Sequence, residues 1–158
     1  NGVPDAMNAA WGTITDMNEI SISMSEHKTT ENLAKTGAFT VSIGTEDTVV
    51  ACDYVGVESA KKVPDKFAKA GFHAIKSTFV NAPLIDELPM ALECKVKRFE
   101  DGILVGEIVN VNAEESILTD GKIDPKKLKP ISYDPVNNTY LAMGDKVGNA
   151  FKDGLKLK

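Results

Sequence analysis

The segment from residue 25 to residue 33, SEHKTTENL, gathers side chains that could bind a small anion. His27 and Lys28 stand where a strand-like run ends, and Thr29 and Thr30 stand where a helix begins. The first N–H groups of a helix have no intrahelical acceptor, and hydroxyl and ammonium donors beside them suit a phosphomonoester. Alternatively, a threonine only caps the helix while His27 and Lys28 are solvated, and the residues alone leave both readings open.

The elements around this segment are predicted from apolar periodicity. Residues 20–25 (ISISMS) and 39–43 (FTVSI) alternate apolar and polar side chains, as half-buried strands do. Between them residues 29–35 predict a short helix, with a threonine as its N-cap and Gly37 as the left-handed residue that ends it. The segment is therefore expected to join two strands through one helix.

The rest of the chain predicts short elements joined by loops. Residues 92–99 and 103–111 alternate strongly around Glu100-Asp101-Gly102, which is typical of a hairpin. Two more helices are expected over residues 48–55 and 64–71, a loop-rich region as far as Pro89, a polar loop over 120–129 and a weaker strand over 140–143.

This count of about five strands and two or three short helices, without a βαβ rhythm, favours a mainly β, partly closed antiparallel barrel. There is no GxGxxG after a strand and no GxxxxGK[ST], so a bound phosphate must be held in another way. The length of 158 residues fits a single domain, residues 1–158. Asn1-Gly2 is typical of a hairpin turn, so a first strand is expected to be missing before it.

Composition narrows the classes of partner. A formal net charge of −5 argues against binding along a nucleic-acid backbone, which requires a concentrated basic face. No run of about 18 apolar residues and no secretory pattern is present, so we expect a soluble protein without a membrane partner. Cys52 and Cys94 show no metal-ligand or CxxC spacing, which predicts no metal site and a reducing cytoplasm.

Five segments in chain order resemble the flavin reductase-like family, the flavoredoxin group of the FMN-binding split barrels. They are PDAMNAAWGT (4–13), similar to the family's tryptophan strand; TTENL (29–33), similar to T-x-E-N-[LI]; DYVG (53–56), similar to a D-[YF]-x-G turn; DKFAKAG (65–71), similar to a substrate-side helix; and LVGEIVNV (104–111), similar to a G-E-V strand. The resemblance implies a Greek-key split β-barrel that forms a homodimer with FMN at the subunit interface.

The resemblance also implies positions for the cofactor. The phosphate would be held by Thr29 and Thr30 with His27 or Lys28, and the backbone of residues 8–11 would run beside the isoalloxazine, with Trp11 as a wall. The expected cofactor-binding residues are Asn8, Ala9, Ala10, Trp11, His27, Lys28, Thr29, Thr30, Asn32, Lys62, Lys66 and Tyr133. The alternatives are a core position for Trp11 and Tyr133, and two solvated lysines for Lys62 and Lys66.

Two departures from the family stand out. Asp5 occupies a position where many relatives have Asn. The hairpin before the G-E strand has Glu100-Asp101-Gly102 where relatives often have a His, which puts a proton-handling or nicotinamide contact in doubt. His73 is expected to be structural, and Cys94 to be a buried strand residue without a redox role.

The sequence thus predicts an oxidoreductase in which non-covalently bound FMN transfers electrons or hydride. Either NADH or NADPH could be the donor, or the protein could be an electron carrier with a redox partner protein, which the absence of a nicotinamide fingerprint favours. No side chain is assigned a catalytic role. The alternatives are a non-catalytic FMN-binding module and a pyridoxamine-phosphate oxidase-like enzyme.

Overall fold

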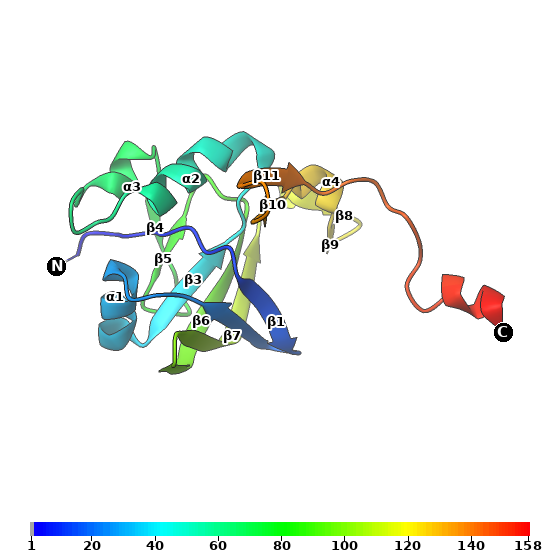
Figure 1. Ribbon diagram of the computed structural model, residues 1–158, viewed down its shortest axis with the longest axis horizontal. Helices are drawn as coiled ribbons and strands as arrows, with labels where there is room; N and C mark the ends of the chain where they lie inside the picture. Colours follow the sequence, from blue (N-terminus) through cyan, green and yellow to red (C-terminus); the bar gives the residue numbers. More distant parts are fainter. Residues whose placement is uncertain (1) are drawn as a thin grey trace.

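The computed structural model describes residues 2–158, and its centre is one five-stranded antiparallel sheet (Figure 1). The strands occur in the order β1-β2-β7-β6-β3, and their bounds are β1 (Gly12–Asp16), β2 (Glu19–Ser23), β3 (Ala38–Ser42), β6 (Met90–Glu100) and β7 (Ile103–Ala113). Because the β6–β7 hairpin lies between β2 and β3, the connection is that of a Greek key. The prediction of a mainly β fold with Greek-key connections is confirmed.

The predicted hairpin is confirmed and is longer than its alternating pattern. Its turn residues Asp101 and Gly102 have φ angles of 50° and 75°. Two consecutive positive φ values are the signature of a type I′ turn, whose twist matches that of the two strands. The hairpin therefore forms from local sequence, and it supplies the two longest strands of the sheet.

One hydrophobic core lies between the sheet and α1 (Lys28–Thr36). Leu33 of α1 packs in this core with strand residues Ile20, Ile22, Phe39, Leu92, Cys94 and Leu104. Gly106 of β7 faces Phe39 so closely that a Cβ there would lie 2.4 Å from the ring Cζ. This contact explains why the G-E motif has a glycine at this position.

A second core lies around α2 (Val49–Val57) and α3 (Lys66–Lys69), and a 3₁₀ turn, η1 (Glu46–Thr48), precedes α2. It contains Cys52, Val55, Phe67, Phe72 and Leu88. Both predicted helices are confirmed, with shifted ends. Residues 53–56, which resemble a family turn motif, lie inside α2, as the helix expected over residues 48–55 indicated for all of them except Gly56.

The smaller elements complete the chain. They are β4 (Ala74–Lys76), β5 (Pro83–Ile85), η2 (Glu115–Ile117), β8 (Leu118–Thr119), β9 (Lys122–Ile123), α4 (Pro125–Leu128), β10 (Ile131–Asp134), β11 (Thr139–Ala142) and η3 (Asp153–Leu157). The weak strand expected at 140–143 corresponds to β11. The count of about five strands was too low, because the pairs β4–β5, β8–β9 and β10–β11 form separate two-stranded sheets.

The polar loop expected over residues 120–129 is also ordered, which corrects the prediction. Asp120 and Gly121 have φ angles of 51° and 72° and turn the β8–β9 hairpin. The Asp124 carboxylate then accepts a hydrogen bond from the N–H of Lys126 and caps α4, with Pro125 in its first turn. Polarity alone did not distinguish these turn and cap residues from a loop.

The N-terminal segment differs most from expectation. Residues 2–10 have no regular secondary structure, and β1 begins only at Gly12, so the expectation of a strand over residues 4–13 is wrong for most of its length. The turn expected at Asn1-Gly2 includes Asn1, which lies outside the described residues. Among residues 2–158 no helix has the length and apolarity required to cross a membrane. Within the same range no three His, Cys, Asp or Glu side chains cluster as metal ligands would.

Candidate functional site

The candidate site is built on residues 4–11, which we call the strap. The strap runs between α1 on one side and α2 and α3 on the other (Figure 1). It is anchored by its side chains: Asp5 contacts α1 and α3, Asn8 contacts α2 and β11, and Ala6 packs on the second core. At its end the N–H of Ser23 donates to the Trp11 carbonyl at 2.8 Å. These contacts fix the backbone path of a segment that has no regular secondary structure.

The first anchor is a buried ion pair. The Lys66 ammonium donates to the carbonyls of Val55 at 2.8 Å and Glu58 at 2.9 Å, and lies 3.5 Å from Asp5 Oδ1. The Thr29 hydroxyl donates to Asp5 Oδ2 at 3.3 Å. Lys66 is only 4% exposed, so the alternative that it is a solvated lysine is wrong. A buried ammonium needs oxygen partners, and a carboxylate at position 5 supplies one with a charge that an asparagine lacks.

The second anchor is a chain of hydrogen bonds that local sequence did not indicate. Asn8 Nδ2 donates to the Tyr140 hydroxyl at 2.9 Å, and that hydroxyl donates to Asp53 Oδ1 at 2.6 Å. Burial, together with the bond to Asp53, raises the pKa of Tyr140 to about 12, so the phenol keeps its proton. A Cβ on Gly56 would lie 2.8 Å from the Asn8 Cβ, so only a glycine lets the strap approach α2 this closely.

These contacts give the DYVG motif of α2 a physical meaning. Asp53 holds Tyr140, the Val55 carbonyl accepts from Lys66, and Gly56 leaves room for Asn8. All three therefore position the strap. The motif contributes to the site by holding the strap in place. Because its residues are spaced along one helix, α2 contacts the strap at two positions, Asp5 through Lys66 and Asn8 directly and through Tyr140.

The strap ends at Trp11, whose side chain points outward. The residue is 66% exposed, so the alternative that it is a core aromatic is wrong for this chain. A large exposed aromatic beside a fixed backbone offers a flat apolar surface to a ligand or to another molecule. Ala9 and Ala10, just before it, are exposed as well.

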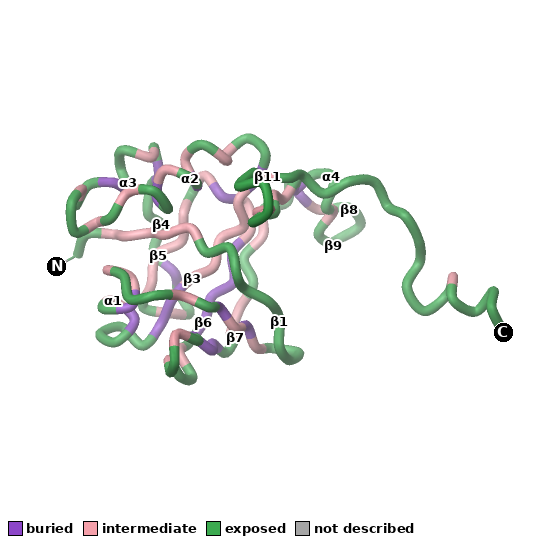
Figure 2. Tube along the Cα trace, in the orientation of Figure 1, coloured by how far each residue is buried: buried purple, intermediate pink, exposed green. Residues whose placement is uncertain are grey.

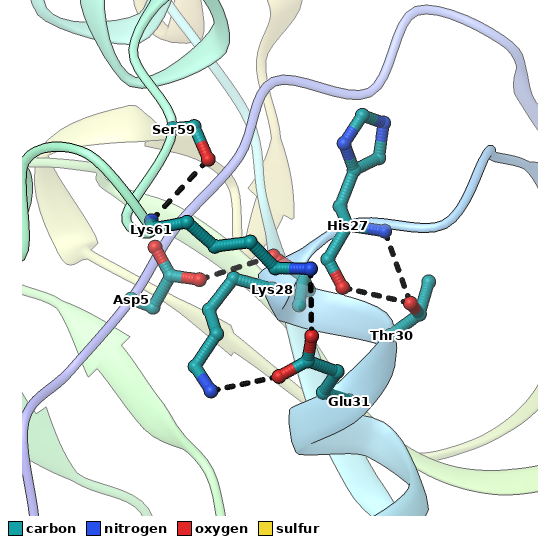
Figure 3. Close-up of polar contacts among 8 residues, drawn as sticks. Asp5, His27, Lys28, Thr30, Glu31, Ser59 and Lys61 are labelled. Atoms are coloured by element: carbon teal, nitrogen blue, oxygen red, sulfur yellow. Dashed lines mark hydrogen bonds and ion pairs between the residues drawn. The ribbon is translucent and has the colours of Figure 1, made fainter.

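The start of α1 differs in detail from the prediction (Figure 3). The helix is capped at His27, because the Thr30 hydroxyl accepts from the His27 N–H at 3.1 Å and donates to the His27 carbonyl at 2.8 Å. The expectation of a threonine N-cap is therefore wrong. The predicted end of the helix is confirmed, with Gly37 at a φ of 62°.

Cations gather beside this helix start. The Glu31 carboxylate binds the ammonium groups of Lys28 at 2.9 Å and Lys61 at 2.8 Å (Figure 3). Hydrogen bonds from Lys61 and Lys28 lower the pKa of Glu31 to about 2. His27 is exposed next to them. Sequence reasoning selected Lys62 and missed Lys61, although the two are adjacent, because nothing local indicates which one faces α1.

The other residues predicted to bind the cofactor are Asn32, Lys62 and Tyr133. Asn32 is half-buried on α1, and Lys62 is exposed beyond Lys61. The Tyr133 ring packs against Tyr140 with centroids 5.9 Å apart, and its hydroxyl donates to Asn138 Oδ1 at 2.7 Å. Tyr133 therefore touches the second anchor through a residue that contacts the strap. A role in binding a cofactor stays a prediction for all of the expected residues.

The two cysteines and His73 also carry side chains that could react, and they lie outside the site. Burial raises the pKa of the Cys52 thiol, and burial with the neighbouring Glu93 raises the pKa of Cys94 to about 12, so neither forms a thiolate readily. The Glu87 carboxylate accepts from the His73 main-chain N–H at 2.9 Å and also contacts the His73 ring. This pairing agrees with the structural role expected for His73.

A strap between a cation-bearing helix start and an exposed indole fits the class of flavin-binding split barrels, and comparison with known proteins agrees. Residues 2–129 match the model of the flavin reductase like domain. The fold superposes on flavoredoxin of Desulfovibrio vulgaris (Miyazaki F) with a TM-score of 0.92 and 35% identity, over 96% of this chain and 85% of that one. For flavoredoxin from Methanosarcina acetivorans the TM-score is 0.89 and the identity 30%, over 98% and 85%.

The chain therefore belongs to the flavin reductase-like family. An uncharacterized protein of Aquifex aeolicus (strain VF5) is 29% identical over 108 residues, which cover 65% of this chain and 55% of that protein. This chain thus matches only about half the length of that relative. The fold alone is shared with an FMN-binding domain of a flavin reductases-like enzyme from Shewanella baltica OS155, at a TM-score of 0.82 and 17% identity, over 92% of this chain and 82% of that one.

The donor set fits a flavin that carries a phosphate, the class of cofactor that the family indicates. Lys28, Lys61, His27 and the first turn of α1 offer the positive charge and N–H donors that a phosphate requires. The strap backbone and the Trp11 indole offer a polar edge and an apolar surface to a flat ring. The two threonines fit less well than expected, because the Thr30 hydroxyl already bonds both main-chain groups of His27 and the Thr29 hydroxyl already donates to Asp5.

Proposed function

We propose that this protein binds FMN non-covalently and transfers electrons or hydride through it, as an oxidoreductase of the flavoredoxin type. The observation that carries the proposal is the anchored strap, which connects the cationic start of α1 with the exposed Trp11. The likeness to two flavoredoxins at 35% and 30% identity supports it.

In this proposal the chain's own residues bind and orient the cofactor. Lys28, Lys61 and His27 neutralise the phosphate, and Thr29, whose hydroxyl donates to Asp5, holds the strap beside the helix start. The strap backbone and Trp11 hold the ring, and Lys62 adds positive charge to the surroundings of the site. Bound FMN supplies the redox chemistry, since it accepts and releases one or two electrons.

The buried anchors determine how rigid this arrangement is. Lys66 lies in the pair with Asp5, so we assign it to positioning the strap rather than to direct contact with FMN. Tyr140 has the same role for Asn8. A flavin site held by buried hydrogen bonds changes shape little when the cofactor changes oxidation state, which favours fast electron transfer.

The finer assignments belong to the same proposal. We propose a homodimer with FMN at the subunit interface, because the exposed Trp11 offers a surface that a second copy could cover. NADH or NADPH is the donor in a reductase, and a redox partner protein takes that place in an electron carrier. Free, buried Cys52 and Cys94 fit a reducing compartment, so we place the protein in the cytoplasm.

The test is the visible absorption spectrum of the protein incubated with FMN and freed of excess cofactor. Flavin bands that bleach under anaerobic conditions on addition of NADH or NADPH support a reductase, and bands that bleach only with dithionite support a carrier or binding module. A protein that retains no flavin after incubation overturns the proposal.

A further inference from the structure

Residues 143–158, which we call the C-terminal arm, leave the body of the domain after β11 and run away from it (Figure 1). The arm is exposed along nearly its whole length (Figure 2). Apolar side chains recur in it every four residues and are all exposed, namely Met143, Val147, Phe151 and Leu155, followed by Leu157. Phe151 is 99% exposed. Five uncovered apolar side chains within 15 residues make this segment a candidate interaction surface.

The course of the arm is shared with solved structures. The superposition on flavoredoxin from Methanosarcina acetivorans covers 98% of this chain, which leaves about three residues outside it. Most of the arm therefore lies within the segment that the two proteins share. A shared segment that makes little contact with its own body is a candidate for contact with another molecule.

Charge favours an acidic partner surface. The arm carries four lysines and two aspartates, a formal charge of +2, whereas the whole chain carries −5. The rest of the chain therefore carries −7, and a second copy of it offers the arm a surface of opposite sign. Two copies that each carried a charge of −7 without their arms would repel one another. Exchange of the positively charged arms reduces that repulsion.

A receiving face of suitable chemistry exists on the body. β1 is an edge strand of the main sheet, and all five of its residues are exposed. Ile14 on β1 and Met17 in the turn after it present uncovered apolar side chains, and the exposed Trp11 directly precedes β1. Asp16 adds negative charge to the same hairpin, whereas the Glu19 carboxylate is paired with Lys97 of β6. Apolar contacts with acidic neighbours suit an arm with apolar residues and lysines.

We propose that the arm of one copy packs on the β1–β2 hairpin of a second copy, and that the exchange is reciprocal in a two-fold dimer. The chain's own hairpin is not its target, because the arm projects away from the body (Figure 1). A stable interface contains about 20–30 residues on each side. An arm of residues 143–158 together with the hairpin that receives the partner's arm reaches that size.

This inference rests on the proposed homodimer and deepens it by naming the segments that join the copies. It does not depend on the redox activity. The two can therefore fail separately, because flavin binding is read from the visible spectrum and arm exchange is read from the mass and the Trp11 environment of the FMN-free protein.

The experiment compares the full chain with the double variant Val147→Asp/Phe151→Asp by sedimentation equilibrium, without FMN. The unmodified chain is expected near 34 kDa, twice its 17.0 kDa. The arm variant should have a dimer dissociation constant at least about 100-fold higher, since it places charges at two apolar contacts of each arm. The matched control is Val50→Asp/Val136→Asp, which changes two exposed valines outside the arm and the hairpin and should leave the dimer intact.

A second readout uses Trp11, the single tryptophan of the chain. Iodide should quench Trp11 fluorescence more strongly in the arm variant than in the control, because loss of the partner's arm uncovers the hairpin beside it. Far-UV circular dichroism confirms that each variant is folded. A monomeric unmodified chain, a dimer that the arm variant leaves unchanged, or unchanged quenching in a dissociated variant overturns the proposal.

Discussion

The buried ammonium of Lys66 leads to the sharpest prediction about stability. Replacing it by methionine keeps an unbranched apolar stem and removes the charge. Two main-chain carbonyls, of Val55 and Glu58, then lose a donor, and the Asp5 carboxylate loses the one cation within 4 Å among the described residues. Breaking a buried ion pair from one side costs about 3–5 kcal/mol. Asp5 lies in the irregular strap and can move toward water, so we expect the lower end, about 3 kcal/mol.

The assay is urea unfolding followed by far-UV circular dichroism, with free energies of unfolding compared at equal m-values. Lys62→Met is the matched control, since Lys62 is exposed four residues before α3 and its loss should change stability by about 0.5 kcal/mol or less. The Asp5→Asn background adds a double-mutant cycle. With a neutral amide at position 5, the cost of Lys66→Met should fall by at least about 1 kcal/mol, because no buried charge is left unpaired.

Either of two results would refute this reasoning. If Lys66→Met costs no more than Lys62→Met, the ammonium does not hold the strap to α2 and α3. If the cost of Lys66→Met is the same with Asp5 and with Asn at that position, the ion pair contributes nothing and only the carbonyl contacts matter. In the second case the departure of Asp5 from the family pattern would have no electrostatic role.

Three further measurements test other contacts. Tyr140→Phe removes the hydroxyl that links the strap to α2 and should lower the free energy of unfolding by about 1–2 kcal/mol, and an unchanged urea midpoint would contradict the network. Gly106→Ala places a methyl group against the Phe39 ring and should cost about 1–3 kcal/mol, whereas a neutral result would mean that the ring moves away freely. The hydrogen bond with Glu87 raises the pKa of His73 above 6.5, so its stabilisation is complete below pH 6.5 and is lost as the pH rises through the raised pKa. NMR titration should find that raised pKa, and Glu87→Gln should return it to the ordinary range.

Local sequence was sufficient for the elements whose signals are local. The β6–β7 hairpin follows from strict alternation around an Asp-Gly pair, because alternation buries one face of each strand and that pair accepts positive φ angles. Helix α1 follows from helix formers that end at Gly37. The resemblance to the flavin reductase-like family rested on motifs in chain order, and it was confirmed.

Motif residues were found from sequence, but their structural setting was not. The DYVG segment resembles a turn motif, but α2 continues through it, because the burial of Cys52 and Val55 against α3 outweighs the low helix propensity of Gly56. The strap was expected to be a strand and is irregular, because its hydrogen-bonding partners are side chains on other elements. The irregular course of the strap has no local signature in the sequence.

The sequence by itself determined the fold class, the hairpin, α1 and the set of candidate residues, since these depend on periodicity, turn chemistry and motif order. Only the tertiary structure decided which residues hold the site. Asn8 and Tyr140 are 132 positions apart, and Lys66 is buried although the lysines at positions 61, 62 and 69 are exposed. Such contacts form only when segments that are distant in sequence pack together. Which side chains are buried, and which of them form pairs, therefore depends on the two hydrophobic cores that bring these segments together.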